Sequence, residues 1–192
     1  MSEKAFTLAG TAQALGSSLV HPLDEFYAQA GQPLPPLNQV QGSKVPEPYK
    51  TLLVHQNDMT PTLEKFYNSK IHIQVIGRRR KEDAYFREVL LLLDRDEKAV
   101  EFGAIKIHLD LFPKPAQDAI LEERLPLGRI LADHKISHTS RPSAFLRVAS
   151  DPLINNVLKT SGALVLFGRR NTLFDPKNRP LAEIVEILPA AN

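Results

Sequence analysis

From residue 71 onward, apolar side chains recur at every second position in segments that short polar turns separate. This spacing is typical of β-strands, because successive side chains of a strand point to opposite faces of a sheet. Three such segments follow one another at 71–76, 85–93 and 100–109. Their short polar connections predict that they pair as an antiparallel meander.

Helices and further strands are expected beyond the meander. Short helices are expected at 116–123 and 127–133, and another begins at Asp151 and Pro152, residue types favoured at the cap and first position of a helix. Three more strands are expected, at 136–148, 164–174 and 181–188. Because the strands outnumber the helices and come in neighbouring pairs, we predict an α+β fold with an antiparallel β-sheet rather than a doubly wound parallel sheet.

Prolines cluster in the first 50 residues. Proline disfavours helix in the residue before it, so we expect short helices at 23–30 and 49–55 with extended linkers, and a clearer helix that starts near Thr60. Polar residues interrupt the apolar ones at the N-terminus, which argues against a secretory signal. We therefore expect residues 1–20 to be a mobile tail and 21–192 to form a single domain.

Composition excludes several classes of function. The formal net charge of +2 is too small to steer the whole molecule onto nucleic acid or a membrane. The absence of cysteine excludes disulfides, thiolate nucleophiles and zinc–sulfur sites. No stretch approaches the roughly 20 apolar residues of a membrane helix, and no nucleophile elbow, glycine-rich phosphate loop or His-Glu-x-x-His pair is present. We expect a cytoplasmic protein without a membrane span, cofactor or metal.

The strand at 85–93 contains one charged residue that alternation places among apolar ones. Arg87 shares a face with Tyr85, Val89, Leu91 and Leu93. An unpaired buried charge costs several kcal/mol or more, so this guanidinium needs a partner. That partner is either a carboxylate of the protein, in an internal salt bridge, or a carboxylate of a ligand, held by the planar fork of N–H donors.

The last strand also contains charged residues on otherwise apolar faces, and these are negatively charged. Glu183 alternates onto one face of this strand and Glu186 onto the other, and both faces are otherwise apolar. One of the two must therefore face the core side of the sheet, where burial raises the pKa of a carboxyl group. It either pairs with Arg87 or forms a hydrogen bond with a ligand, and periodicity does not decide which glutamate it is.

Two basic clusters remain. Residues 78–81 precede a turn and are expected to be a solvated hairpin end, with nucleic-acid binding as an alternative that no interleaved aromatic residues support. Arg169 and Arg170 follow Gly168 inside a strand. A glycine at that place indicates a bulge or a close approach of two backbones.

Five stretches in order resemble the chorismate lyase (chorismate–pyruvate lyase) family, and together they cover about residues 50–190. They are Asn57-Asp58-Met59-Thr60, Phe86-Arg87-Glu88-Val89-Leu90-Leu91, Leu125-Pro126-Leu127-Gly128-Arg129-Ile130-Leu131, Phe167-Gly168-Arg169-Arg170-Asn171, and Arg179-Pro180-Leu181 followed by Glu186-Ile187-Leu188-Pro189. The resemblance implies an antiparallel sheet with helices and helical flaps covering an enclosed site. It also implies cofactor-free elimination of pyruvate from chorismate to give 4-hydroxybenzoate, a carbon–oxygen lyase activity that supplies quinone biosynthesis.

The same resemblance implies a set of site residues. Arg87 and the backbone N–H of Leu127 would bind the ring carboxylate, Glu186 would bond the ring hydroxyl, and Met59 would border the pocket. For the chemistry we expect Arg169, in preference to Arg170, to stabilise the departing enolpyruvate. The alternative is a non-catalytic domain of the same fold that binds an aromatic acid. Both readings expect a small-molecule ligand and no nucleic acid, and leave the oligomeric state open.

Overall fold

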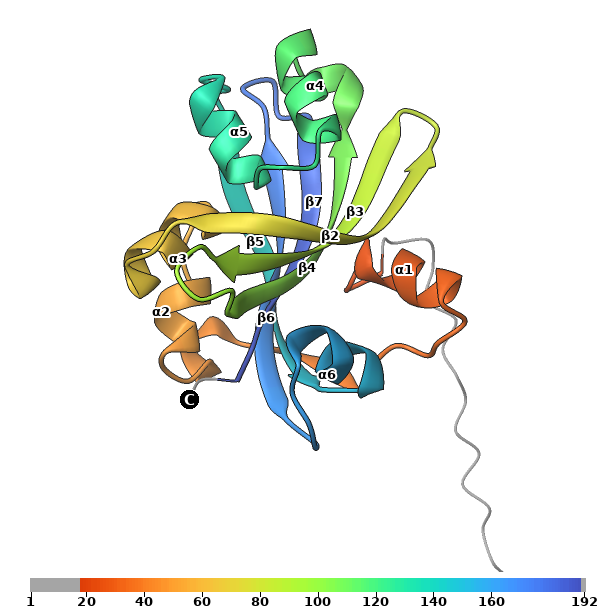
Figure 1. Cartoon of the computed structure of the whole chain (residues 1–192), viewed down its shortest axis with the longest axis vertical. Helices are drawn as coiled ribbons and strands as arrows, with labels where there is room; N and C mark the ends of the chain where they lie inside the picture. Colours follow the sequence, from red (N-terminus) through yellow and green to blue (C-terminus); the bar gives the residue numbers. More distant parts are fainter. Residues whose placement is uncertain (1–17, 191–192) are drawn as a thin grey trace, which may run out of the picture.

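In the computed structural model, which describes residues 18–190, seven strands form one antiparallel sheet (Figure 1). The strand order is β1-β5-β6-β7-β4-β3-β2. The strands are β1 (Leu37–Val40), β2 (Ile71–Lys81), β3 (Ala84–Leu93), β4 (Ala99–His108), β5 (Thr139–Ala149), β6 (Val165–Phe174) and β7 (Pro180–Leu188). The predicted meander is therefore one half of the sheet, and β7 joins it to the other half.

Helices cover both faces of this sheet. They are α1 (Leu23–Gln29), α2 (Tyr49–Leu53), α3 (Met59–Tyr67), α4 (Lys114–Leu121), α5 (Leu127–Asp133) and α6 (Pro152–Leu158), with 3₁₀ turns at Gly42–Lys44 and Leu109–Leu111. No helix within residues 18–190 is long and apolar enough to cross a membrane. The predicted α+β fold class, an antiparallel sheet with covering helices, is confirmed.

Two features of the N-terminal third differ from the sequence-based expectation or lie beyond it. Strand β1 falls in the proline-rich linker and pairs with β5 at the edge of the sheet, a long-range contact that local propensity does not encode. The segment predicted to be a mobile tail, residues 1–20, lies outside the described residues except for its last three, of which Val20 is buried.

The core has a different organisation on each face of the sheet. On one face, α1 and α6 pack on a single apolar cluster that includes Phe86 and Phe102. On the other face there are two clusters, one under α2 and α3 around Leu91, and one under α4 and α5 around Ile105. Figure 1 shows these two helix pairs in separate places along the sheet. The strip of sheet between the two clusters is where the cavity lies.

Candidate functional site

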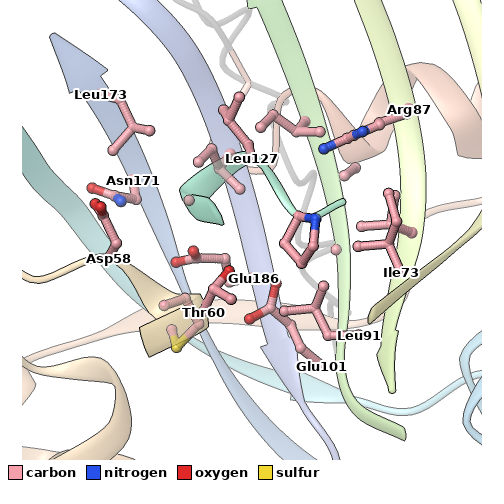
Figure 2. Close-up of a pocket in the computed structure, with 18 residues that line it drawn as sticks. Asp58, Thr60, Ile73, Arg87, Leu91, Glu101, Leu127, Asn171, Leu173 and Glu186 are labelled. Carbon is pink, nitrogen blue, oxygen red and sulfur yellow. The ribbon is translucent and has the colours of Figure 1, made fainter. Parts of the chain in front are cut away.

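A cavity of about 580 Å³, part of it open to solvent, lies on the strip between the two clusters (Figure 2). Its floor is formed by side chains of strands β2, β3, β4, β6 and β7, and its cover is formed by the N-terminal ends of α3 and α5. Most of the lining is aliphatic, and the polar groups within it are few.

Arg87 enters this cavity from the middle of β3, a strand in which every residue is buried. Its side chain is 2% exposed. Nε and Nη1 have no hydrogen-bond partner among the described residues, and Nη2 donates only a long bond of 3.5 Å to the carbonyl of Leu125. Burial lowers the pKa of Arg87 to about 10, although the nearby Tyr85 and the charge of Glu123 partly oppose this effect; lowering is the expected effect of removing a cation from water.

The possible internal partner for Arg87 is engaged elsewhere. Glu186 forms a buried ion pair with Arg169, which lies directly opposite on β6. Gly168 makes this register possible, because a Cβ at that position would collide with the backbone carbonyl of Glu186. The close approach of backbones predicted at Gly168 is therefore confirmed, and the internal salt bridge considered for Arg87 is not formed.

Arg169 is fully buried and its donors are all used inside the protein. Besides Glu186, its guanidinium donates to the carbonyls of Leu53, His55 and Asn57 at 3.2–3.3 Å. These carbonyls belong to the segment that connects α2 to α3 and leads to the cover of the cavity. Arg169 thus ties this segment to the sheet and is absent from the cavity lining, although Glu186 beside it is present there.

The choice between the two glutamates of β7 is settled by the side of the sheet that each faces. Glu186 lines the cavity and is 3% exposed. Glu183 points to the opposite face, where the His108 ring, 3.8 Å away, and a hydrogen bond from Lys106 lower the pKa of its carboxyl group to about 2. Glu186 is therefore the glutamate on the Arg87 side, as the resemblance implied.

A further carboxyl group lines the cavity, that of Glu101 in β4, which was not predicted from the sequence as a site residue. It is 5% exposed, and its Oε2 has no hydrogen-bond partner among the described residues. Burial, reinforced by the nearby charge of Glu186, raises the pKa of Glu101 well above its usual value. The signal in the sequence was the same one that singled out Arg87, because Glu101 alternates with Gly103 and Ile105 on the cavity face.

The cover of the cavity consists of two helix ends in contact. Met59 begins α3, Leu127 begins α5, and both line the cavity. The two ends pack so closely that a Cβ at Gly128 would lie 3.3 Å from the hydroxyl oxygen of Thr60. The sequence-predicted residues Arg87, Glu186, Leu127 and Met59 are therefore brought together around one cavity.

An ion pair at the rim joins the cover to strand β5. His138 Nε2 lies 2.9 Å from a carboxylate oxygen of Asp58, the residue that precedes α3. The hydrogen bond with Asp58 raises the pKa of His138, although burial partly opposes this effect. Asp58 also lines the cavity, so this pair helps to hold one of the lining residues in place.

Outside the cavity, the chemistry-bearing residues are mostly paired with each other. Within residues 18–190 no three His, Asp or Glu side chains lie close enough together to hold a metal ion. The basic residues 78–81 lie at the end of β2, where Arg78 pairs with Glu123 at 2.7 Å and Arg79 pairs with Glu25. Two charges of the basic cluster are thereby compensated within the protein.

No protein-family model matches the sequence, and no curated protein is significantly similar to it. Solved structures do share the fold. PhnF from Mycobacterium smegmatis aligns over 71% of this chain and 65% of its own, with 10% identity and a TM-score of 0.56. The separate effector domain of PhnF aligns over 69% of this chain and 88% of its own, with 10% identity and a TM-score of 0.53. A gene product of Staphylococcus aureus aligns over 62% of this chain and 82% of its own, with 11% identity and a TM-score of 0.50.

These similarities correct the expected activity. The prediction of an enzyme, a carbon–oxygen lyase, is wrong, because the solved structures that share the fold include an effector domain, that of PhnF. The site supplies a physical reason, because Arg169, the cation expected to stabilise the departing enolpyruvate, is already neutralised by Glu186. Nothing in the comparisons supports chorismate as a substrate or a role in quinone biosynthesis. The chain has the chorismate lyase-like fold that regulator effector domains also adopt.

Proposed function

We propose that this chain is a non-catalytic binding domain for a small aromatic carboxylic acid, with Arg87 as the group that holds the carboxylate. The observation that carries this proposal is the state of Arg87 itself. It is an almost fully buried guanidinium with two nitrogens that have no hydrogen-bond partner among the described residues, and it lines the cavity. A buried cation without a counter-ion is unfavourable, and an anionic ligand would remove that cost.

The surroundings of Arg87 suit the rest of such a ligand. Val89, Ile105 and Leu173 provide aliphatic walls against which a flat ring can pack. The N–H groups in the first turn of a helix have no partner within the helix, and Leu127, the first residue of α5, lines the same cavity. Its amide is therefore our second candidate donor to the carboxylate.

The similarity to the effector domain of PhnF supports a binding role at the level of the fold. Among the residues that the structure describes, Arg87 is the only cation that lines the cavity, and two of its nitrogens have no hydrogen-bond partner, so it is suited to hold an anion.

Isothermal titration calorimetry with benzoate tests the proposal. Removing one partner of a buried charge-assisted contact costs about 2–5 kcal/mol, so Arg87→Ala should weaken benzoate binding by at least about 30-fold. Arg147→Ala, which removes an exposed arginine of β5, is the matched control and should bind as the wild type does. Equal benzoate affinity of the Arg87→Ala variant and the wild type would show that Arg87 does not hold the carboxylate.

A further inference from the structure

The cavity carries a second set of charges, at a distance from Arg87 along the strands. Arg87 lies opposite Ile105 of β4, whereas Glu101 lies four residues before Ile105 on the same strand. At a rise of about 3.4 Å per residue, the two positions are roughly 14 Å apart along the sheet. Glu186 lies opposite Gly103, between them. We call the part of the cavity at Glu101 and Glu186 the acidic end, and Figure 2 shows it well separated from Arg87.

The acidic end holds two carboxyl groups and one cation. Arg169 of β6 neutralises Glu186 and directs its remaining donors to backbone carbonyls. The other carboxylate of the lining, Asp58, already has His138 as its partner. Glu101 therefore has no cation of its own among the described residues, and its Oε2 has no hydrogen-bond donor.

The two ends of the cavity thus hold unmatched groups of opposite type. At one end lies a buried guanidinium with two nitrogens that have no hydrogen-bond partner among the described residues, and at the other lies a buried carboxyl oxygen without a donor. A single ligand that carries a negative charge at one end and a positive charge at the other would satisfy both. An ammonium has three N–H donors, enough to reach Glu101 Oε2 and a second acceptor at the acidic end.

We propose that the ligand of this cavity is a zwitterion, with its carboxylate on Arg87 and a primary ammonium group held at the acidic end by Glu101. This inference rests on the proposed function, because it places the carboxylate of the same ligand on Arg87. It adds that the other end of the ligand is a primary ammonium group, and it assigns Glu101 as the residue that selects this group. Burial raises the pKa of Glu101 well above its usual value in the ligand-free protein, so an ammonium that pairs with it should make Glu101 release a proton.

A series of matched para-substituted benzoates tests this assignment by calorimetry. The probes are benzoate, 4-hydroxybenzoate and 4-(aminomethyl)benzoate, which share the carboxylate and differ at the other end. We expect 4-(aminomethyl)benzoate to bind at least tenfold more tightly than either of the others. Titration at pH 7 in buffers of different ionisation enthalpy should also detect release of a proton with this ligand and none with benzoate.

Variants separate the role of Glu101 from that of burial in general. Glu101→Gln should reduce the preference for 4-(aminomethyl)benzoate over benzoate to near one. Glu88→Gln, which alters another buried glutamate on the opposite face of the sheet, should leave the tenfold preference in place. Because proton release is measured on the wild type, this readout does not depend on the folding of any variant.

The outcomes distinguish failure of this inference from failure of the proposed function. Benzoate binding that depends on Arg87, together with equal or weaker binding of 4-(aminomethyl)benzoate, would overturn the zwitterion and keep the carboxylate site. Tighter binding of 4-hydroxybenzoate than of the amine, or binding of the amine without proton release, would also overturn the zwitterion. Benzoate binding that is insensitive to Arg87 would overturn the carboxylate site on which both proposals rest.

Discussion

Replacing Arg87 with methionine should make the ligand-free protein more stable. Burial lowers the pKa of Arg87 to about 10, against an ordinary value of about 12.5 for arginine. One pKa unit corresponds to about 1.4 kcal/mol, so holding the charged form in the folded protein at pH 7 costs about 3 kcal/mol. The side chain is 2% exposed, so solvent screening does not reduce this figure much. Methionine keeps much of the length of the side chain and removes the charge.

Urea unfolding of the ligand-free proteins at pH 7 measures this effect. We expect the free energy of unfolding of Arg87→Met to exceed that of the wild type by up to about 3 kcal/mol, comparable to the 1–4 kcal/mol gained when buried ion pairs are replaced by well-packed apolar residues. Thermal unfolding should show a rise in Tm of up to about 10 °C for a chain of this size.

Arg169→Met is the matched control, because Arg169 is an equally buried arginine whose donors are all engaged. Its replacement leaves Glu186 buried without a counter-ion and should destabilise the protein by about 3–5 kcal/mol. The reasoning would be refuted if Arg87→Met lost as much stability as Arg169→Met, since Arg87 would then have a partner in the folded protein that the structure lacks.

Three further predictions concern stability. Burial raises the pKa of Glu88 to about 7, so the folded state binds more protons than the unfolded state between pH 4.5 and 7. In urea unfolding, Glu88→Gln should therefore be more stable than the wild type by roughly 1–2 kcal/mol at pH 8 and differ little from it at pH 4. The ion pair of His138 with Asp58 raises the pKa of His138, so the stability that this pair adds to the folded protein should be full below pH 6.5 and be lost as the pH rises through the folded pKa. If the deficit in Tm of His138→Gln relative to the wild type grew with pH, this expectation would be contradicted. Gly168→Ala should cost about 1–3 kcal/mol or more in urea unfolding, because its Cβ would collide with the carbonyl of Glu186, and an unchanged midpoint would show that β6 and β7 can separate there.

Local patterns were sufficient to predict most of the fold. Alternation placed Arg87 on a buried face, and β3 is indeed buried along its whole length. Aspartate and proline at 151 and 152 predicted the start of α6, where the carboxylate of Asp151 accepts a hydrogen bond from the amide of Ile154. In both cases the relevant information lies within one turn or one strand, where periodicity and capping act.

What could not be predicted depends on contacts between distant segments. The partner of Glu186 is decided by the register of β6 against β7, and single-strand periodicity carries no information on register. The short strand β1 exists because β5 offers it an edge. Glu101 was predictable in principle, since it interrupts an apolar face as Arg87 does, but its significance arises only when β4 and β7 place it beside Glu186.

A crystal structure of the protein with bound benzoate would show directly whether Arg87 holds the carboxylate of a ligand in the cavity beneath the N-terminal ends of α3 and α5. We expect both carboxylate oxygens within hydrogen-bonding distance of the Arg87 guanidinium, and the ring between Val89, Ile105 and Leu173. A ring bound with its carboxylate facing Glu101, or a ligand bound outside this cavity while Arg87 stays unpartnered, would contradict this expectation.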